Sequence, residues 1–275
     1  MVTRRAFALA LPWLGAAALP AMASTGGLLR FVRIRHRTML IELDGRRVLV
    51  DPSFEPAFGA PGLVTAPAPA FDAGAVGDVD LVLVTGCEPG AFGAASARRL
   101  RDRAAPWLVP DEGVAKALRH QGFRRVRVVA AGQRLHVGGV DVVVSPSASL
   151  ATWPGVGFHL SRGGRTLWCA GAPPPIDVDG GAAAFAKGHP AEVAAVCALG
   201  LAIGGTPLTL DADDAELLAR LARARYLVPL HLDATPTGIG ALVLTQARAL
   251  QGHPPAGPRL VVVPAGTWCR VGTIG

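Results

Sequence analysis

The stretch Asp80-Leu-Val-Leu-Val-Thr-Gly-Cys-Glu-Pro-Gly-Ala-Phe92 decides the fold of this chain. Its first part, Leu81 to Val84, is an uninterrupted run of leucine and valine, which predicts a strand that is buried on both faces. The part that follows Thr85 is a loop rich in glycine, and it contains a cysteine and a glutamate but no histidine. A buried strand therefore leads directly into an irregular loop.

Composition places the chain among globular proteins with a substantial core. It has 275 residues, of which 51% are hydrophobic and 17% are charged. This length fits one large domain or two small ones. The net charge of +7 comes mostly from arginines scattered along the sequence, and there is a single tyrosine. Because no ladder of aromatic and basic residues appears, we expect no nucleic-acid partner.

The N-terminal segment has the features of an export signal. Thr3-Arg-Arg-Ala-Phe7 precedes an apolar run over residues 8–19, and Ala21-Met-Ala23 provides a small-x-small cleavage site. The paired arginines resemble the twin-arginine type of signal. We therefore expect residues 1–23 to be removed and the protein to be periplasmic or extracellular. An uncleaved anchor, the alternative, would give the only membrane contact, but prolines at 12 and 20 interrupt the run.

Four cysteines remain after residue 23, namely Cys87, Cys169, Cys197 and Cys269. An even number in an exported protein permits disulfides, yet the spacings match neither a disulfide framework nor a C-x-x-C metal site. Cys169 and Cys197 lie in apolar runs, which favours buried thiols.

The order of predicted elements indicates an α/β fold. Strands are expected at 29–35, 38–43, 46–50, 81–84, 107–109, 125–130, 134–137, 140–144, 156–161, 165–170, 192–201, 226–230, 259–263 and 267–271. Helices are expected at 94–103, 111–121, 211–224 and 238–250, and long loops at 52–78 and 171–190. Residues 24–275 then form one domain, a four-layer αββα sandwich of two mixed β-sheets. A single doubly wound sheet is the alternative, which the early hairpin around Asp44-Gly45 opposes.

Several segments, in this order, resemble the metallo-β-lactamase fold, in particular its lactonase and N-acyl-ethanolamine phospholipase type. The likeness runs from about residue 29 to residue 235. The segments that carry it are His36–Glu42 with Asp44-Gly45, Val48–Pro52, Val79–Thr85, Val109-Pro110, Ala131–Val140, Arg165–Gly171 and Leu227–His231.

The resemblance also implies where a metal site would lie. Enzymes of this fold hold one or two metal ions on a Thr-His-x-His-x-Asp-His loop, a further histidine, a bridging aspartate and a final histidine, and the metals activate a water. The corresponding positions here are Gly86, Glu88, Gly90, Ala91, the segment Ser145–Ser149, Ala172 and His231. Only His231 keeps the residue type. Glycine and alanine offer no donor atom, so we expect no metal cofactor and a pseudoenzyme.

Other assignments for the remaining polar residues stay open. Cys87, Glu88 and His231 are all competent zinc ligands and would form an atypical site if the loops converge. Cys87 and His231 are also the candidate catalytic pair, a thiol nucleophile and its base. The plainer interpretation, which we prefer, is a loop cysteine, a solvated glutamate and a hydrogen-bonded histidine. Asp51 and His36 match framework positions of the family and are expected to cap a turn and orient a loop.

Two functions follow from these observations. The first is a non-catalytic or weakly catalytic protein that binds a small molecule or a protein partner in the ancestral cleft. That cleft is expected to include Gly86, Cys87, Glu88, Ala172, His231 and Asp51. The alternative is a metal-dependent hydrolase of esters, lactones or phosphodiesters with an atypical site around His231, Glu88 and Cys87, where zinc would be the metal.

Overall fold

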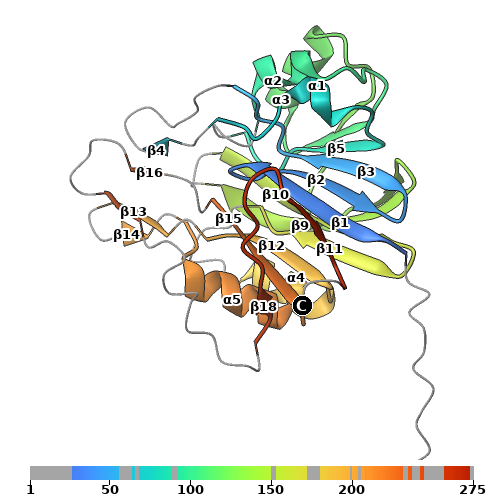
Figure 1. Ribbon diagram of the computed structural model, residues 1–275. Helices are drawn as coiled ribbons and strands as arrows, with labels where there is room; N and C mark the ends of the chain where they lie inside the picture. Colours follow the sequence, from blue (N-terminus) through green and yellow to red (C-terminus); the bar gives the residue numbers. More distant parts are fainter. Residues whose placement is uncertain are drawn as a thin grey trace, which may run out of the picture.

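Two seven-stranded sheets pack face to face, and helices cover their outer faces (Figure 1). The structure is a computed structural model. It describes residues 27–55, 64–65, 68–87, 92–149, 153–171, 180–198, 200–203, 206–207, 209–231, 235–236, 242–244 and 257–272. The expected four-layer αββα sandwich of two mixed sheets is confirmed. The predicted signal, residues 1–23, lies outside the described residues.

The first sheet contains the N-terminal meander and three crossover strands. Its strands, in order across the sheet, are β19 (Trp268–Arg270), β1 (Leu29–Arg35), β2 (Thr38–Leu43), β3 (Arg46–Val50), β5 (Leu81–Leu83), β6 (Trp107–Val109) and β7 (Val126–Val128). The pairs from β19 to β3 are antiparallel, and those from β3 to β7 are parallel. The opening run Leu81–Leu83 is fully buried, as its sequence predicts.

The second sheet repeats this mixture of a meander and parallel strands. Its strands, in order, are β18 (Arg259–Leu260), β15 (Tyr226–Leu230), β12 (Val193–Cys197), β11 (Arg165–Cys169), β10 (Trp153–Arg162), β9 (Val140–Ser149) and β8 (Arg134–Val137). Strands β8 to β11 pair antiparallel, whereas β11, β12, β15 and β18 are parallel. Two small sheets lie apart: β14 (Thr206–Pro207), β13 (Leu201–Ile203) and β17 (Leu242–Leu244), and β16 (Thr235–Pro236) with β4 (Val64–Thr65).

Helices lie on both outer faces. Figure 1 shows α1 (Ala73–Val76), α2 (Ala94–Arg99) and α3 (Glu112–His120) on the first sheet, and α4 (Gly181–Gly188) and α5 (Ala212–Leu221) on the second. Asp111 caps α3 through the backbone N–H groups of its first turn, and Asp211 caps α5 in a capping box. None of the helices in the described part of the chain has the length and apolar character needed to cross a membrane.

The apolar side chains form three layers that follow from strand alternation. One cluster fills the space between the sheets and includes Phe31 and Phe158. A second lies under α2 and α3 and includes Trp107, and a third lies under α4 and α5 and includes Trp168. Successive strand residues point to opposite faces, so each interior strand contributes to two layers.

Several expected elements match the structure residue for residue, namely the strands at 29–35, 38–43, 46–50, 107–109, 134–137 and 226–230. Others differ. The expected loop at 171–190 contains α4, because its alanine run has high helix propensity and buries Ala182, Ala183, Phe185 and Ala186. The loop at 52–78 contains α1 and β4. Within the helix expected at 238–250, residues 242–244 form a strand that pairs with β13, and the remainder lies outside the described residues.

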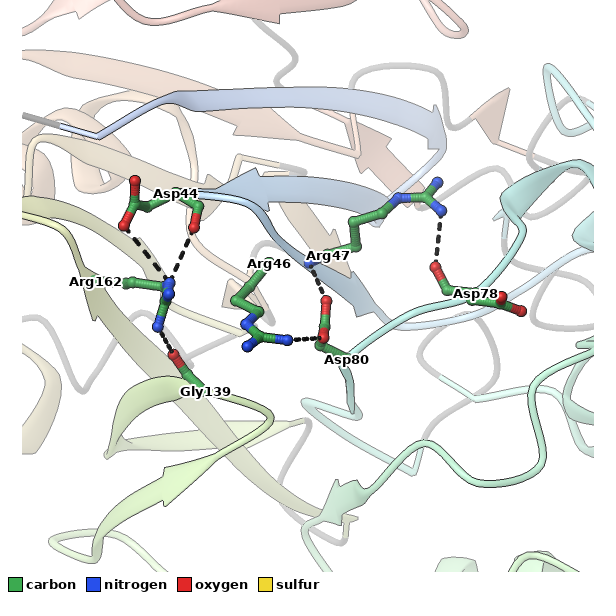
Figure 2. Close-up of polar contacts among 7 residues, drawn as sticks. All are labelled: Asp44, Arg46, Arg47, Asp78, Asp80, Gly139 and Arg162. Atoms are coloured by element: carbon green, nitrogen blue, oxygen red, sulfur yellow. Dashed lines mark hydrogen bonds and ion pairs between the residues drawn. The ribbon is translucent and has the colours of Figure 1, made fainter.

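Charged contacts hold one end of the sandwich together, where the strands of both sheets turn (Figure 2). Asp44 and Gly45 have φ values of 46° and 76°, as a two-residue hairpin turn requires. The guanidinium of Arg162, on the second sheet, donates through Nε to the Asp44 carbonyl at 3.0 Å and through Nη1 to the Gly139 carbonyl at 2.5 Å. Arg162, at the end of β10, thus ties a turn of the first sheet to the turn between β8 and β9 of the second.

The start of β5 belongs to the same end of the sandwich. Asp80 accepts from Arg46 Nη1 at 2.7 Å and from the Arg47 backbone N–H at 2.8 Å, and Arg47 Nη1 donates to the Asp78 carbonyl at 2.7 Å (Figure 2). A Cβ placed on Gly138, whose φ is +61°, would lie 2.3 Å from the Asp80 carbonyl oxygen. The β8–β9 turn therefore approaches β5 closely enough to require glycine. We call this end the turn edge.

Candidate functional site

The opposite end of the same strands gathers the polar residues that point to a site. Asp51, Thr85, Gly171, Cys197 and His231 each come directly or within two residues after a strand that has a parallel neighbour, or end such a strand. We call this end the carboxyl edge. The Val156 N–H donates to the Thr85 carbonyl at 2.8 Å, which joins the two sheets there. Ligands of α/β proteins bind at the carboxyl ends of parallel strands, so this edge is the candidate site.

Asp51 is the centre of a saturated hydrogen-bond network. Its Oδ1 accepts the Thr85 N–H at 2.7 Å, and its Oδ2 accepts the Thr85 hydroxyl at 2.6 Å. The Nε of Arg37 lies 3.2 Å from Oδ2, and both side chains are at most 3% exposed. The Thr38 hydroxyl donates to the Asp51 carbonyl at 2.6 Å. Both carboxylate oxygens are therefore engaged in fixing the start of the loop after β5.

His231 lies at the end of β15 and is 5% exposed. Its Nδ1 is 2.9 Å from the Cys197 Sγ, and its backbone N–H donates to the His36 carbonyl at 3.4 Å. The two imidazoles stack, with 4.0 Å between ring centroids and 21° between ring planes. The Nε2 of His231 has no hydrogen-bond partner among the residues that the structure describes. This ring is thus fixed on one side and has unused hydrogen-bonding capacity on the other.

Burial controls the protonation of this corner. It lowers the pKa of His231 well below its ordinary value, and the nearby His36, Arg37 and Arg33 lower that pKa further. The ring is therefore neutral at neutral pH. Burial also raises the pKa of the Cys169 thiol, with a smaller contribution from the charge of Asp51. The Cys169 thiol stays protonated.

The pairing of β12 with β15 explains why Cys197 meets His231. In this parallel pair, Cys197 lies opposite Leu230, the residue before His231. Cys197 was expected only to be a buried thiol, which it is at 1% exposure, and its contact with His231 was not predicted. The only sequence signal was that Cys197 lies inside the apolar run predicted as the strand 192–201 and that His231 directly follows the predicted strand 226–230. Among the described residues, none of the four cysteines forms a disulfide.

The expected cleft residues lie at different places. Gly86 forms an isolated antiparallel bridge with Gly155, and the Cys87 thiol donates to the Pro154 carbonyl at 3.7 Å. Cys87 lines an open cavity of about 400 Å³ beside α3, together with Phe92 and Val114. Glu88 and Ala172 lie outside the described residues. The thiol in hydrogen-bond contact with His231 is that of Cys197, whereas the sequence suggested Cys87.

The segment where a further histidine would fall continues β9 as far as Ser149. The Ser145 hydroxyl accepts the indole N–H of Trp168 at 3.0 Å. The Ser147 Oγ is buried and has no hydrogen-bond partner in the described part of the chain. It lies 2.7 Å from where a Cβ on Gly171 would be, so the hydroxyl occupies the space next to that glycine. Neutral hydroxyls are poor substitutes for imidazole ligands.

Within the described residues, the donor atoms at the carboxyl edge do not fit the metal centre of the fold. Across the described residues, no group of three or more histidine, cysteine, aspartate or glutamate side chains could hold a metal ion. Asp51 uses both oxygens for Thr85 and Arg37, and Gly86 has no side chain. The Nε2 of His231 is left as an unshared nitrogen, and one imidazole does not hold zinc tightly.

His159 lies away from this edge and has a structural role, as expected. Its Nε2 donates to the Pro190 carbonyl at 2.9 Å, and the side chain is 7% exposed. Burial lowers the pKa of His159, and the positive charge of Arg134 contributes in the same direction.

Solved structures of hydrolases share this architecture at low sequence identity. Isothiocyanate hydrolase from Delia radicum gut bacteria superposes with a TM-score of 0.68 and 16% identity, over 87% of this chain and 98% of that one. A possible metal-dependent hydrolase from Veillonella parvula DSM 2008 gives a TM-score of 0.65 and 14% identity, over 88% and 99%. The metallo hydrolase Igni18 from Ignicoccus hospitalis KIN4/I gives 0.58 and 16%, over 88% and 98%. At these identities the likeness shows the fold alone.

No curated protein sequence matches the chain. A sequence model of the beta-lactamase superfamily domain matches residues 46–232, which include Asp51, Thr85, Cys197 and His231. The match spans more than half of the chain and agrees with the metallo-β-lactamase fold seen in the two sheets. The chain therefore belongs to the family defined by the beta-lactamase superfamily domain.

Proposed function

We propose that this protein binds a small molecule at the carboxyl edge and does not carry out the metal-dependent hydrolysis typical of its fold. The observation that carries the proposal is the donor set of that edge. Where the fold's metal ligands would stand, the described positions hold Gly86, a continuation of β9 and the single imidazole of His231. A shared metal-bound water needs several nitrogen and carboxylate ligands, and this set does not provide them.

The framework around the edge supports a binding role. Asp51, Thr85 and Arg37 hold the end of β5 in one geometry, and His36 with Cys197 holds the ring of His231. Binding sites on such scaffolds are largely pre-formed, because rigid elements position the few polar groups that select a ligand. The edge keeps this rigidity although its metal ligands have changed.

Metal-dependent hydrolysis at an atypical site is the competing function. In its favour, the full-length structural neighbours include proteins described as metal-dependent hydrolases, and the His231 Nε2 is free of hydrogen bonds within the described residues. Cys87 and Glu88 would then complete a zinc site with His231. The two proposals differ in bound metal and in turnover.

Metal analysis separates them. We expect the protein, purified without chelator, to contain well below one equivalent of zinc, iron or manganese by inductively coupled plasma mass spectrometry. We also expect no turnover of a panel of esters, lactones and phosphodiesters. His136→Ala is the matched control for His231→Ala, because His136 is exposed and lies on β8. Near-stoichiometric metal that is lost in His231→Ala and kept in His136→Ala, with turnover that follows the metal, would overturn the proposal.

A further inference from the structure

Nearly all of the net positive charge of the chain comes from one segment. Residues 98–127, which run from the end of α2 into β7, contain nine Lys or Arg and three Asp or Glu, a net charge of +6 out of the +7 of the whole chain. The remaining 18 of the 27 bases are matched by the remaining 17 of the 20 acids. The uncompensated charge is therefore local, although arginines occur along the whole chain.

The strand register places the bases of this segment at the turn edge. The parallel strands β5, β6 and β7 start side by side, because Val82 pairs with Trp107 and Trp107 pairs with Val126. The start of β5 belongs to the turn edge, so the loops that lead into β6 and β7 lie there as well. These two loops contain most of the arginines of the segment.

Hydrogen bonds join these loops to the C-terminal ends of α2 and α3. Arg103 donates through Nη2 to the Arg98 carbonyl at 2.9 Å and through Nη1 to the Gln121 carbonyl at 3.2 Å. Arg125 Nη1 donates to the Ala104 carbonyl at 3.4 Å. The result is one continuous surface beside α2 and α3 (Figure 1). We call it the basic patch, and it consists of Arg98, Arg101, Arg103, Arg119, Arg124 and Arg125.

The basic patch has little counter-charge. All six of its residues are exposed. Within the described residues, the only ion pair that they form is the one between Arg119 and Glu112. Asp102 lies inside the patch, but its carboxylate accepts the backbone N–H groups of Ala104 and Ala105. Like charges at close range repel, and binding of an anion relieves that repulsion.

Helix stability explains only part of the basic patch. Basic side chains in the last turn of a helix interact favourably with its dipole, and Arg98 and Arg119 occupy the last turns of α2 and α3. Arg101, Arg103 and Arg124 lie outside both helices and gain nothing from this effect. Their presence at the same place points to an external anionic partner.

The composition of the patch indicates which anion it fits. Guanidinium groups bind phosphate oxygens with two parallel hydrogen bonds. The large apolar side chains that are exposed in the described part of the chain lie elsewhere, at Leu217, Val262 and Trp268, and Phe123 is buried beneath Arg103. The patch thus offers neither aromatic rings on which bases stack nor apolar groups that insert into lipid. Clusters of four to eight such bases are typical of electrostatic contact with anionic lipid head groups.

We propose that the basic patch binds the phosphate head groups of an anionic lipid bilayer by surface electrostatics. The predicted export signal favours a lipid surface over nucleic acid as the partner. The inference is independent of the proposed function, because the patch lies at the turn edge, whereas Asp51 and His231 lie at the carboxyl edge. Contact through the patch leaves the carboxyl edge directed away from the lipid.

Cosedimentation of the full chain with vesicles tests the proposal. One set of vesicles is pure phosphatidylcholine, and the other contains equal parts of phosphatidylcholine and phosphatidylglycerol. We expect saturable binding to the anionic vesicles at about 0.1 M salt, at least about tenfold tighter than to the neutral ones, and its loss at about 1 M salt. Any binding through residues 1–23 occurs with neutral vesicles as well. Equal binding to both sets, or binding that salt does not weaken, would overturn the inference.

Competitors distinguish the lipid surface from other sources of phosphate. Inorganic phosphate and a DNA duplex are added separately, each at the phosphate concentration of the anionic vesicles. We expect the protein to remain on the vesicles in both cases. Displacement by inorganic phosphate would show a site for a single anion, and displacement by the duplex would show a nucleic-acid surface. Either result overturns the assignment to lipid.

A triple variant tests whether the patch itself makes the contact. Three of its side chains form no hydrogen bond or ion pair with any described residue, so their replacement removes charge without removing an internal contact. The substitutions are Arg98→Gln, Arg101→Gln and Arg124→Gln. We expect binding to anionic vesicles to weaken on the order of fivefold for each arginine and on the order of a hundredfold for the three.

The control variant removes the same charge from the other side of the sandwich. It replaces three exposed bases of α4 and of the turn after α5, namely Lys187→Gln, Arg223→Gln and Arg225→Gln. We expect binding to weaken by no more than about twofold, because these charges lie beyond the screening length from a bilayer held at the patch. If both triple variants weakened binding equally, net charge and not the basic patch would be responsible, and the proposal would be wrong.

Discussion

Each end of the sandwich has an ion pair between an arginine and an aspartate, exposed at one end and buried at the other. At the turn edge, Arg46 pairs with Asp80 at 2.7 Å, with side chains 43% and 27% exposed. At the carboxyl edge, Arg37 pairs with Asp51 at 3.2 Å, with side chains 3% and 2% exposed. Water screens the first pair and is excluded from the second. By distance alone, the Arg46–Asp80 pair would be the stronger of the two. Burial predicts the opposite: removing one partner should lower the free energy of unfolding more at the buried Arg37–Asp51 pair.

Removal of the Asp51 carboxylate should have the largest effect. Asp51→Ala leaves the Arg37 charge and the Thr85 N–H and hydroxyl buried without their acceptor. We expect the free energy of unfolding to fall by about 3–5 kcal/mol, as when one partner of a buried pair is lost. Urea denaturation with a fixed slope checks this value. If Asp51→Ala lowered the free energy of unfolding no more than Asp80→Ala does, burial would not explain a difference in stability between the two ion pairs.

Removal of one hydrogen bond to the same carboxylate should have an intermediate effect. Thr85→Val keeps the backbone N–H bond to Oδ1 and removes the hydroxyl bond to Oδ2. Hydrogen bonds to charged groups contribute about 1.5–3 kcal/mol, and we expect a loss in that range by urea denaturation.

The matched control is Thr166→Val on β11. The Thr166 hydroxyl accepts the neutral Glu192 N–H at 2.8 Å, so about 1 kcal/mol is expected. Equal losses at both positions would mean that the charge of Asp51 adds nothing to its bond with Thr85.

The exposed pair at the turn edge should contribute little. In Asp80→Ala, the Arg46 guanidinium stays hydrated and Arg47 loses one backbone hydrogen bond. We expect the ion pair to account for about 0.2–1 kcal/mol of the loss, because exposed ion pairs fall in that range. The part due to the ion pair should shrink in 1 M salt, where screening is strong, while the effect of Asp51→Ala persists. If the loss of unfolding free energy in Asp80→Ala did not depend on salt, the exposed pair would behave like the buried Arg37–Asp51 pair.

Periodicity was sufficient to predict most of the framework that separates these two ends. Residues 29–50 form a meander because Asp44-Gly45 supplies the positive φ values of a tight turn between alternating strands. The same reasoning fails at 181–188, where an alanine-rich stretch between glycine and proline predicts a loop and the structure has a helix. Its helix is stabilised by packing on the second sheet, which sequence alone does not display.

The candidate site was less predictable than the framework. That His231 ends a buried strand was visible in its sequence, and so was the loss of the other ligand types. The partner of its ring was not, because Cys197 lies 34 residues away and meets His231 only through the register of two parallel strands. Similarly, nothing local indicates that Arg37 turns inward to Asp51, since arginine is normally exposed.

His159 is buried but has no carboxylate partner among the described residues, and replacing it should change stability less than the substitutions above. His159 is 7% exposed, and burial lowers its pKa in the folded protein below the ordinary value of about 6.5. Below that pH the unfolded chain takes up a proton more readily than the folded one, so stability falls as the pH decreases. His159→Gln should flatten this decline between neutral and mildly acidic pH in urea titrations. Leu160→Val, a change in the same strand that does not titrate, should lower the stability curve by a constant amount. If His159→Gln also gave a parallel curve, burial of His159 would not contribute to the acid sensitivity of the fold.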